Sequence, residues 1–199
     1  MFEKDTEESV HRFACSLEYD VRLYPYDIRT SRCHAEALRG AGVLDDGECA
    51  TLIQALNEIE SELDAGVFVF QPNDEDIHSA VERSLTERLG PLGGKLRTAR
   101  SRNDQVAADL RLFLKDDCLA VCRLIVGMNH ALIEAAERCP ESPMPGYTHM
   151  QPAQPVLFAH HLMAYFEMFK RDVARFLNAR QLLDICPLGS GSLAGVGPG

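Results

Sequence analysis

The sequence has no excess of positive charge, no apolar leader and no long uninterrupted apolar run. Its 199 residues include 30 acidic and 20 basic side chains, which gives a formal net charge of -10. This balance argues against a general binder of nucleic acid or of anionic membranes, because such proteins need a basic surface. The first nine residues, MFEKDTEES, are acidic, and Arg123 interrupts the longest apolar run, Leu119 to Met128. We therefore expect neither an export signal nor a membrane span.

Paired-cysteine motifs are absent as well. Seven cysteines, an odd number, are scattered along the chain without a CxxC. Cys118 and Cys122 have helical spacing, but no histidine or carboxylate set surrounds them, so the pattern does not indicate a zinc site. Reduced thiols of this kind are typical of cytoplasmic proteins, and we expect this chain to be cytoplasmic. With 46% hydrophobic residues, the chain is long enough for one large domain or two small ones.

Proline is missing from a long stretch in the second half of the chain, which predicts an unusually long helix. From Gln105 to about Arg138 there is no proline and one glycine, Gly127. At 1.5 Å per residue such a helix would extend about 50 Å. A second long helical pattern runs from about Val156 to Ile185. Two helices cannot bury apolar faces this wide, so we expect a larger bundle, completed by further chain or by other subunits.

Shorter helices are predicted in the first half. Residues 1–30 are polar and are predicted to be irregular, with Ser31 capping a helix that ends at Gly40 or Gly42. Spacing and stop signals predict three further elements: amphipathic helices over Asp45–Ala65 and Asp74–Gly90, and an extended connector over Val67–Asn73. The predicted fold class is therefore all-α.

The turn-rich stretch Met144 to Pro155, MPGYTHMQPAQP, separates the two long helical patterns. Its prolines and glycine exclude a helix interior, so Tyr147 to Gln151 are predicted to lie on a loop or short turn. His149 can exchange a proton near neutral pH, and Thr148 and Gln151 bring hydrogen-bonding groups beside it. We interpret this stretch as half of an active site, although a structural or surface histidine remains an alternative.

A second polar stretch precedes the first long helix. Lys95, Arg97, Arg100 and Arg102 lie within eight positions, mixed with small hydroxyl and amide residues such as Asn103. Guanidinium groups match carboxylates, and free N–H groups at a helix start attract negative charge, so this composition indicates anion recognition. A solvated basic loop is the alternative.

Asp76 and His78 lie near the start of the predicted helix over Asp74–Gly90. An acidic residue there can simply complement the helix dipole, and spacing alone favours that interpretation.

Five motifs follow one another along the chain: YPYDIRTS at Tyr24, NDEDIH at Asn73, TARSRND at Thr98, MPGYTHMQPAQP at Met144 and PLGSGSLAG at Pro187. In this order they resemble the N-terminal part of the argininosuccinate lyase family, in the fumarase and aspartase superfamily. Other branches of the superfamily have SSND-like or STND-like text in place of Ser101-Arg102-Asn103-Asp104, and an arginine in place of Tyr147.

The resemblance implies a carbon–nitrogen lyase that cleaves argininosuccinate into arginine and fumarate, the last step of arginine biosynthesis, with no metal or organic cofactor. By similarity, His149 would act in proton transfer, polarised by an acidic partner from elsewhere, and Arg102 would bind substrate carboxylates. The other residues that would hold the substrate or lie near it are Ser31, Asp76, His78, Asn103, Thr148 and Gln151.

Family members are more than twice this length, and their third signature, a flexible GSSxMPxKxN loop with the catalytic serine and an essential lysine, would lie beyond residue 199. We therefore expect an N-terminal fragment. The resemblance also implies a homotetramer whose active sites combine signatures from three subunits. Residues 1–104 would form a small helical N-terminal domain, and residues 105–199 the first long helices of a central bundle.

Two residues depart from the family pattern: Thr30 stands where glycine is usual, and Arg97 where histidine is usual. Two other functions remain open. One is a non-catalytic, crystallin-like helical protein of the same family, and the other is a different lyase of the superfamily.

Overall fold

The computed structural model describes residues 8–191 and 193–195. Within this part of the chain the fold is helical with one small two-stranded sheet, which confirms the predicted all-α class. The N-terminal segment considered above for an export signal lies largely outside the described residues. Two compact units divide the chain: unit 1 runs up to Phe113 and resumes at Cys186, and unit 2 covers Leu114–Ile185. The predicted domain boundary between residues 104 and 105 stays a prediction.

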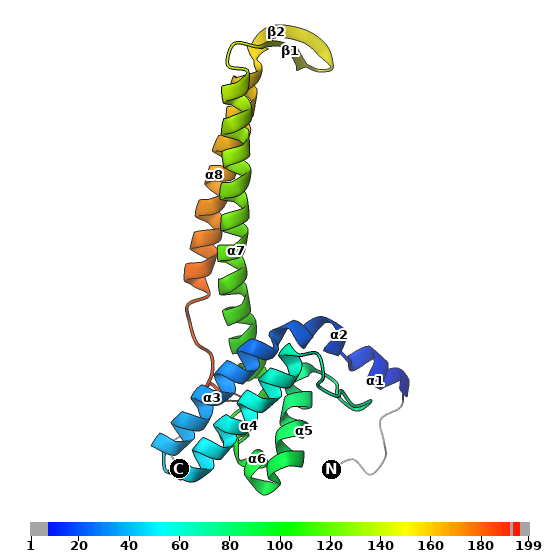
Figure 1. The fold of residues 1–199 in the computed structure, drawn as a ribbon, viewed down its shortest axis with the longest axis vertical. Coiled ribbons are helices and arrows are strands. Elements are labelled where there is room, and N and C mark those ends of the chain that lie inside the picture. Colours follow the sequence, from blue (N-terminus) through cyan, green and yellow to red (C-terminus); the bar gives the residue numbers. More distant parts are fainter. Residues whose placement is uncertain (1–7, 192, 196–199) are drawn as a thin grey trace. The chain divides into compact units, whose positions relative to one another are not determined.

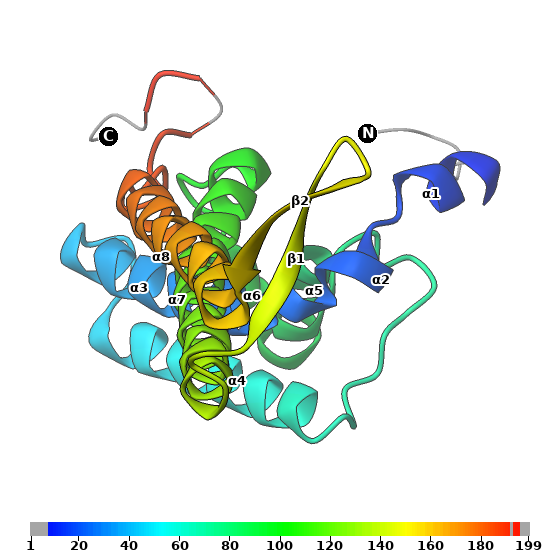
Figure 2. The same cartoon turned by 90° about the horizontal axis from the view of Figure 1, so that it is seen from above.

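Unit 1 is a layered set of helices in which α3 packs against α4, and α4 against α5 and α6 (Figures 1 and 2). Its core is formed by aliphatic side chains with almost no exposed surface, among them Ile28, Leu52, Leu56, Ile77 and Leu85. The elements are α1 (Glu8–Ala14), α2 (Leu17–Asp20), η1 (Val21–Leu23), α3 (Tyr24–Gly40), α4 (Asp46–Asp64), α5 (Ile77–Leu89), α6 (Pro91–Lys95) and the first turns of α7 (Arg102–Arg138).

Polar caps fix where two of these helices begin. The side chain of Asp45 accepts a hydrogen bond from the backbone N–H of Glu48, and Glu48 reaches back to Asp45, so α4 starts with a capping box. Asp76 and Ser79 form the same arrangement at the start of α5. The helix predicted over Asp45–Ala65 is thereby confirmed, and α5 begins a few residues later than predicted.

The predicted role of Ser31 as a helix cap is wrong. Ser31 lies inside α3, which already begins at Tyr24, and η1, α2 and α1 make most of the preceding described segment helical. Pro25 occupies the first turn of α3, where its missing N–H would have no partner in the helix anyway. Ser31 is therefore free to direct its hydroxyl towards other elements of unit 1.

Unit 2 consists of the rest of α7, the hairpin strands β1 (Pro143–Thr148) and β2 (Gln151–Leu157), and α8 (Phe158–Leu182). The two long helices lie side by side, and the hairpin joins them at one end (Figures 1 and 2). The thiol of Cys122 on α7 contacts the carbonyl oxygen of Val173 on α8 at 3.8 Å. Both long helices predicted from the sequence are confirmed.

Much of the apolar surface of these two helices is uncovered. Leu124 is 73% exposed, and Met128, Met168 and Leu177 are about half exposed. Within the described residues, α7 is also the one helix that is long and apolar enough to span a membrane. A core helix of a water-soluble bundle meets the same criterion, so this is weak evidence, and the expected absence of a membrane span stays a prediction.

The loop predicted over Tyr147–Gln151 is shorter than expected, because strands extend almost to its tip. His149 and Met150 alone form the turn, with φ angles of 50° and 60°. Positive φ at both central residues is typical of the turns that fit the twist of a hairpin. The prolines are compatible with strands here because each strand has one partner and one free edge.

Candidate active site

The predicted site residues fall into two groups, one in each unit. Unit 1 holds Ser31, Asp76, His78, Arg102 and Asn103, and unit 2 holds Thr148, His149 and Gln151.

A buried polar cluster lies at the centre of unit 1, where α3, α5 and α7 meet. The imidazole Nδ1 of His78 donates to Asp27 Oδ1 at 2.9 Å and lies 3.4 Å from Asp109 Oδ2. The amide of Gln105 also donates to Asp27, and the hydroxyl of Thr30 lies 2.7 Å from Asp109 Oδ1. His78, Asp27 and Asp109 have side chains at most 1% exposed, so their polar atoms depend on contacts within the protein rather than on bulk water.

Electrostatics divide the cluster into an ionised pair and a protonatable acid. Burial would raise the pKa of Asp27, but the hydrogen bond and charge of His78, helped by Arg100, lower it. Burial would lower the pKa of His78, but the carboxylates of Asp27 and Asp109 raise it. Burial, with the negative charge of Asp27, raises the pKa of Asp109 to about 7. Asp109 therefore exchanges a proton near neutral pH beside an ionised Asp27–His78 pair.

The same three side chains have metal-ligand chemistry, and their ligand atoms lie within 4.8 Å of one another. One oxygen each of Asp27 and Asp109 is buried without a hydrogen-bond partner. However, the His78 nitrogen that would face a metal already donates a proton to Asp27. The geometry favours a proton-linked network, and the expected absence of a metal or cofactor stays a prediction.

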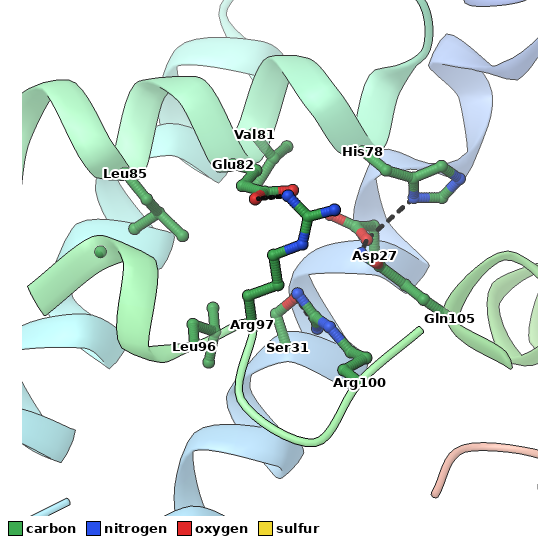
Figure 3. Close-up of a pocket in the computed structure, with 11 residues that line it drawn as sticks. Asp27, Ser31, His78, Val81, Glu82, Leu85, Leu96, Arg97, Arg100 and Gln105 are labelled. Atoms are coloured by element: carbon green, nitrogen blue, oxygen red, sulfur yellow. Dashed lines mark hydrogen bonds and ion pairs between the residues drawn. The ribbon is translucent and has the colours of Figure 1, made fainter. Parts of the chain in front are cut away.

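Ser31 lies next to this cluster and beside the arginine-rich loop. Its hydroxyl accepts a hydrogen bond of 3.0 Å from Nη1 of Arg100. Figure 3 shows both residues around a cavity of about 10 Å³ that is also lined by Asp27, His78 and Gln105. His34 on α3 also contacts this loop, because its Nε2 lies 2.9 Å from the carbonyl oxygen of Thr98. Ser31 and the arginine-rich loop are thus in direct contact, while the expected role of Ser31 in holding the substrate stays a prediction.

Arg102 lies between α5 and the buried cluster, because its Nη1 donates a hydrogen bond of 3.3 Å to Oε1 of Gln105. Its Nη2 donates to Glu82 Oε2 at 3.0 Å, and its Nε lies 3.8 Å from Asp76 Oδ2. Asp76 also accepts a 2.6 Å hydrogen bond from the N–H of Ser79, so it caps α5 and contacts Arg102 at the same time. Asn103 is exposed in the first turn of α7, and within the described residues its side-chain amide forms no hydrogen bond.

Asp104 joins two of the sequence motifs. Its Oδ2 accepts hydrogen bonds from the backbone N–H groups of Gly189, at 3.2 Å, and Gly191, at 2.8 Å. Its Oδ1 accepts from the N–H of Ser101 at 3.2 Å. The segment PLGSGSLAG, of which Ser192 lies outside the described residues, is therefore fastened to the start of α7.

The unit 2 residues lie at the tip of the hairpin and are exposed. Thr148 and Gln151 are paired across the strands and flank the turn. His149 takes φ of +50°, a conformation that costs energy for a residue other than glycine, although histidine tolerates it better than most. Among the described residues, no hydrogen bond holds the His149 ring. The hairpin thus presents a hydroxyl, an imidazole and an amide together.

Three residues of unit 1 were missed by the sequence analysis: Asp27, Glu82 and Asp109. Each lies four residues from another polar residue of unit 1, of which Ser31 and His78 were predicted site residues, and residues four apart share one face of a helix. The pairs are Asp27 with Ser31, Glu82 with His78, and Asp109 with Gln105.

The chain is similar to known lyases over nearly its whole length. The profile of a family described as "Lyase" matches residues 1–199. An argininosuccinate lyase from Dehalococcoides mccartyi strain CBDB1 is 50% identical over 195 residues, which are 98% of this chain and 42% of the relative. One from Acidothermus cellulolyticus is 52% identical over 188 residues, 94% of this chain and 38% of the relative. The chain therefore spans less than half the length of these relatives.

Solved structures give the same picture of the fold. An EDDS lyase in complex with formate superposes with a TM-score of 0.77 at 30% identity, covering 88% of this chain and 34% of the other. A fumarate lyase from Mesorhizobium sp. BNC1 gives 0.70 at 18% identity, covering 96% and 44%. The second likeness concerns the fold alone.

Proposed function

Since the chain belongs to the lyase family whose profile matches all of its residues, we propose that it is the N-terminal part of an enzyme that cleaves argininosuccinate into arginine and fumarate. The observation that carries this proposal is the identity of about one residue in two with argininosuccinate lyases over 98% of the chain. The two polar groups described above supply chemistry that such a β-elimination requires.

The elimination removes a proton from the carbon next to a carboxylate, and negative charge then accumulates on that carboxylate. Preorganised donors around it lower the barrier. In unit 1, Arg102, Arg100 and Ser31 provide guanidinium and hydroxyl donors, and Asn103 adds an amide at the start of α7. Guanidinium groups suit this task because they match carboxylates with two parallel hydrogen bonds.

The departing guanidinium nitrogen must also be protonated. We assign proton transfer to His149, with Thr148 and Gln151 binding the substrate beside it. His149 is exposed and its ring has no hydrogen-bond partner within the described residues. Its acidic partner is therefore expected from another part of the assembled enzyme.

We further propose a cytoplasmic homotetramer in which each active site combines segments of different subunits. The uncovered apolar faces of α7 and α8 support association, because burial of such surface stabilises an assembly. The short coverage of the relatives supports a site that needs further chain, including the segment with the serine and lysine of the third family signature.

The test is fumarate release from argininosuccinate, followed by ultraviolet absorbance. We would compare the 199-residue chain with a chimera in which it is continued by the C-terminal remainder of the D. mccartyi relative. We expect turnover by the chimera and none by the chain alone. A folded, tetrameric chimera that releases no fumarate would contradict the proposal and would indicate a non-catalytic, crystallin-like role. A chimera that cleaves a different fumarate-yielding substrate instead would indicate another lyase of the superfamily.

A further inference from the structure

Glu82, on α5, holds two arginines of the loop before α7. Its Oε1 accepts a hydrogen bond of 3.0 Å from Arg97 Nη1, and its Oε2 accepts one of 3.0 Å from Arg102 Nη2. One carboxylate therefore occupies both guanidinium groups, one oxygen to each. This is the arrangement that a carboxylate of a bound ligand would adopt between two arginines.

The Glu82–Arg97 bridge also borders both cavities of this region. The inner cavity, with Ser31 and Arg100, has about 10 Å³, room for no more than a single water. The outer cavity has about 390 Å³, a volume typical of small-ligand sites, and Arg102 lines it. Figure 3 shows the Arg97 side chain extending to Glu82, with Ser31 and Arg100 nearby. The bridge thus lines both the open outer cavity and the smaller, more enclosed inner cavity.

The exposure of the bridge indicates that it opens easily. The side chains of Arg97, Arg102 and Glu82 are 67%, 30% and 27% exposed. The bond to Arg97 is exposed, and such a pair contributes about 0–1 kcal/mol, because water solvates the separated charges well, whereas the bond to Arg102 is half-buried. By contrast, the pair of Arg83 with the buried carboxylate of Asp74 (3% exposed) is built as a structural contact. A ligand carboxylate can therefore compete with Glu82 at small cost.

We propose that Glu82 is an internal competitor for the substrate carboxylate: it occupies Arg97 and Arg102 in the ligand-free chain and is displaced when a dicarboxylate binds. Displacement moves the Glu82 carboxylate into the outer cavity and releases the wall between the two cavities. Glu82 thereby sets the affinity of the arginine pair and favours ligands that bring a carboxylate to both guanidinium groups. This inference rests on the proposed function, because it takes the substrate to be a dicarboxylate.

The experiment measures fumarate binding to the 199-residue chain by isothermal titration calorimetry and NMR at physiological salt. Glu82→Gln removes the competing charge, and we expect the dissociation constant for fumarate to fall about tenfold, the worth of a typical hydrogen bond to a charged group. Glu82→Asp keeps the charge on a shorter side chain, so its dissociation constant for fumarate should stay closer to that of the unaltered chain. Circular dichroism confirms that each variant is folded.

The matched control is Glu87→Gln. Glu87 lies on the same helix, also borders the outer cavity and also pairs with an arginine, but its partner is Arg83. Its removal changes the local charge equally without freeing Arg97 or Arg102. We expect the dissociation constant for fumarate to change by less than about twofold in Glu87→Gln, because salt screens the effect of a surface charge that does not contact the ligand.

Equal or weaker fumarate binding by Glu82→Gln would overturn the inference, since it would mean that Glu82 only positions the loop. Equal gains in Glu82→Gln and Glu87→Gln would also overturn it, because general charge would then explain both. Absence of binding by every variant would overturn it too. The proposed function is judged separately, by turnover of argininosuccinate in the chimera.

Discussion

Asp109 is a carboxyl group without exposed surface, set beside a second carboxylate, and its pKa is raised to about 7. A raised pKa means that the folded state favours the neutral form of the acid. At pH values below this raised pKa at which Asp109 is already ionised in the unfolded chain, the folded state still keeps it protonated. In the same cluster, the raised pKa of His78 means that the fold favours the imidazolium. Both groups make the stability of unit 1 depend on pH.

The sign of this dependence follows from proton binding. Between about pH 4, where an unfolded aspartate ionises, and pH 7, the folded state binds more protons at Asp109 than the unfolded chain does. The free energy of unfolding therefore falls as pH rises. The contribution of His78 is fully present below about pH 6.5 and is lost as pH rises through its raised pKa, in the same direction. The lowered pKa of Asp27 acts in the opposite sense, but only below its unfolded value, in acid.

We expect the unfolding free energy to be lower at pH 8 than at pH 5, with Asp109 accounting for roughly 1–4 kcal/mol, since one pKa unit is about 1.4 kcal/mol. In Asp109→Asn, which cannot ionise, the decline should be clearly smaller. Urea unfolding followed by circular dichroism at both pH values measures it. Parallel pH dependence in the two proteins would show that Asp109 does not titrate in this range.

A second residue-level prediction concerns His149. In the chimera, His149→Asn should lower turnover of argininosuccinate by about 10²- to 10⁴-fold, the usual contribution of a positioned proton-transfer group. Substrate binding and the fold should persist, because His149 is exposed and makes no contact that holds the hairpin. Steady-state rates together with fumarate affinity check this, and a near-normal rate would remove His149 from proton transfer.

The hairpin of β1 and β2 is the element that presents Thr148 and His149, and its geometry depends on one glycine. The strand register is irregular between Pro145 and Tyr147, where Gly146 lies. A Cβ atom added at Gly146 would stand 2.5 Å from the carbonyl oxygen of Gln154 on the opposite strand. No side chain flexes away there, because the obstacle is backbone.

Gly146→Ala should therefore push the strands apart and displace Thr148 and His149. We expect turnover in the chimera to fall at least about tenfold, in line with the cost of small misplacements of catalytic groups. The helices should remain intact by circular dichroism. The control is Gly127→Ala in α7, where an added Cβ meets nothing within 4 Å and helix propensity should add about 0.5–1 kcal/mol of stability. Unchanged turnover in Gly146→Ala would mean that the hairpin adapts without cost.

How much the sequence could predict also differs from element to element. The helices α4, α7 and α8 follow from apolar spacing and from the absence of proline, and these predictions are confirmed. The early start of α3 was missed because Pro25 suggested a break, although proline is tolerated in a first turn. The hairpin was missed because prolines argue against strands, yet a two-stranded ribbon has free edges.

The candidate site shows the same limit. Composition indicated Arg102, the family resemblance added Ser31 and His78, and the structure places all three around the cavities of unit 1. It did not identify Asp27 or Glu82, because their contacts join residues 51 and 15–20 positions apart and arise only when the helices pack. The spacing of residues in the sequence predicts which side chains lie on the same face of a helix, but it does not predict which helix faces pack against each other.

At the scale of the whole molecule, the apolar faces of α7 and α8 set the expectation of assembly. Leu124 is 73% exposed within the chain, far more than a leucine at the centre of a helix bundle. Contacts between copies would bury such side chains, each with a gain of about 1.5–3 kcal/mol.

We expect Leu124→Lys to weaken self-association of the chimera at least about tenfold, since a buried lysine would replace a buried leucine. Thermal unfolding of the isolated chain should hardly change, because the site is exposed there. Sedimentation velocity over a range of concentrations measures the association. Leu193→Lys, at a leucine that is 93% exposed and lies outside the two long helices, is the control, and equal effects of both substitutions would argue against an interface at Leu124.

The hydrogen bonds of Asp104 have one more consequence. They connect the start of α7 to Gly189 and Gly191, which follow α8 by only a few residues. The segment of unit 1 that precedes unit 2 is thus hydrogen-bonded to the segment of unit 1 that follows it. Unit 2 is in this sense an insertion between two segments of unit 1, and the Asp104 carboxylate joins those two segments to each other. A change in the length of the two long helices, or in the hairpin that joins them, would therefore leave the contacts of the arginine loop and of the buried acids within unit 1 unchanged.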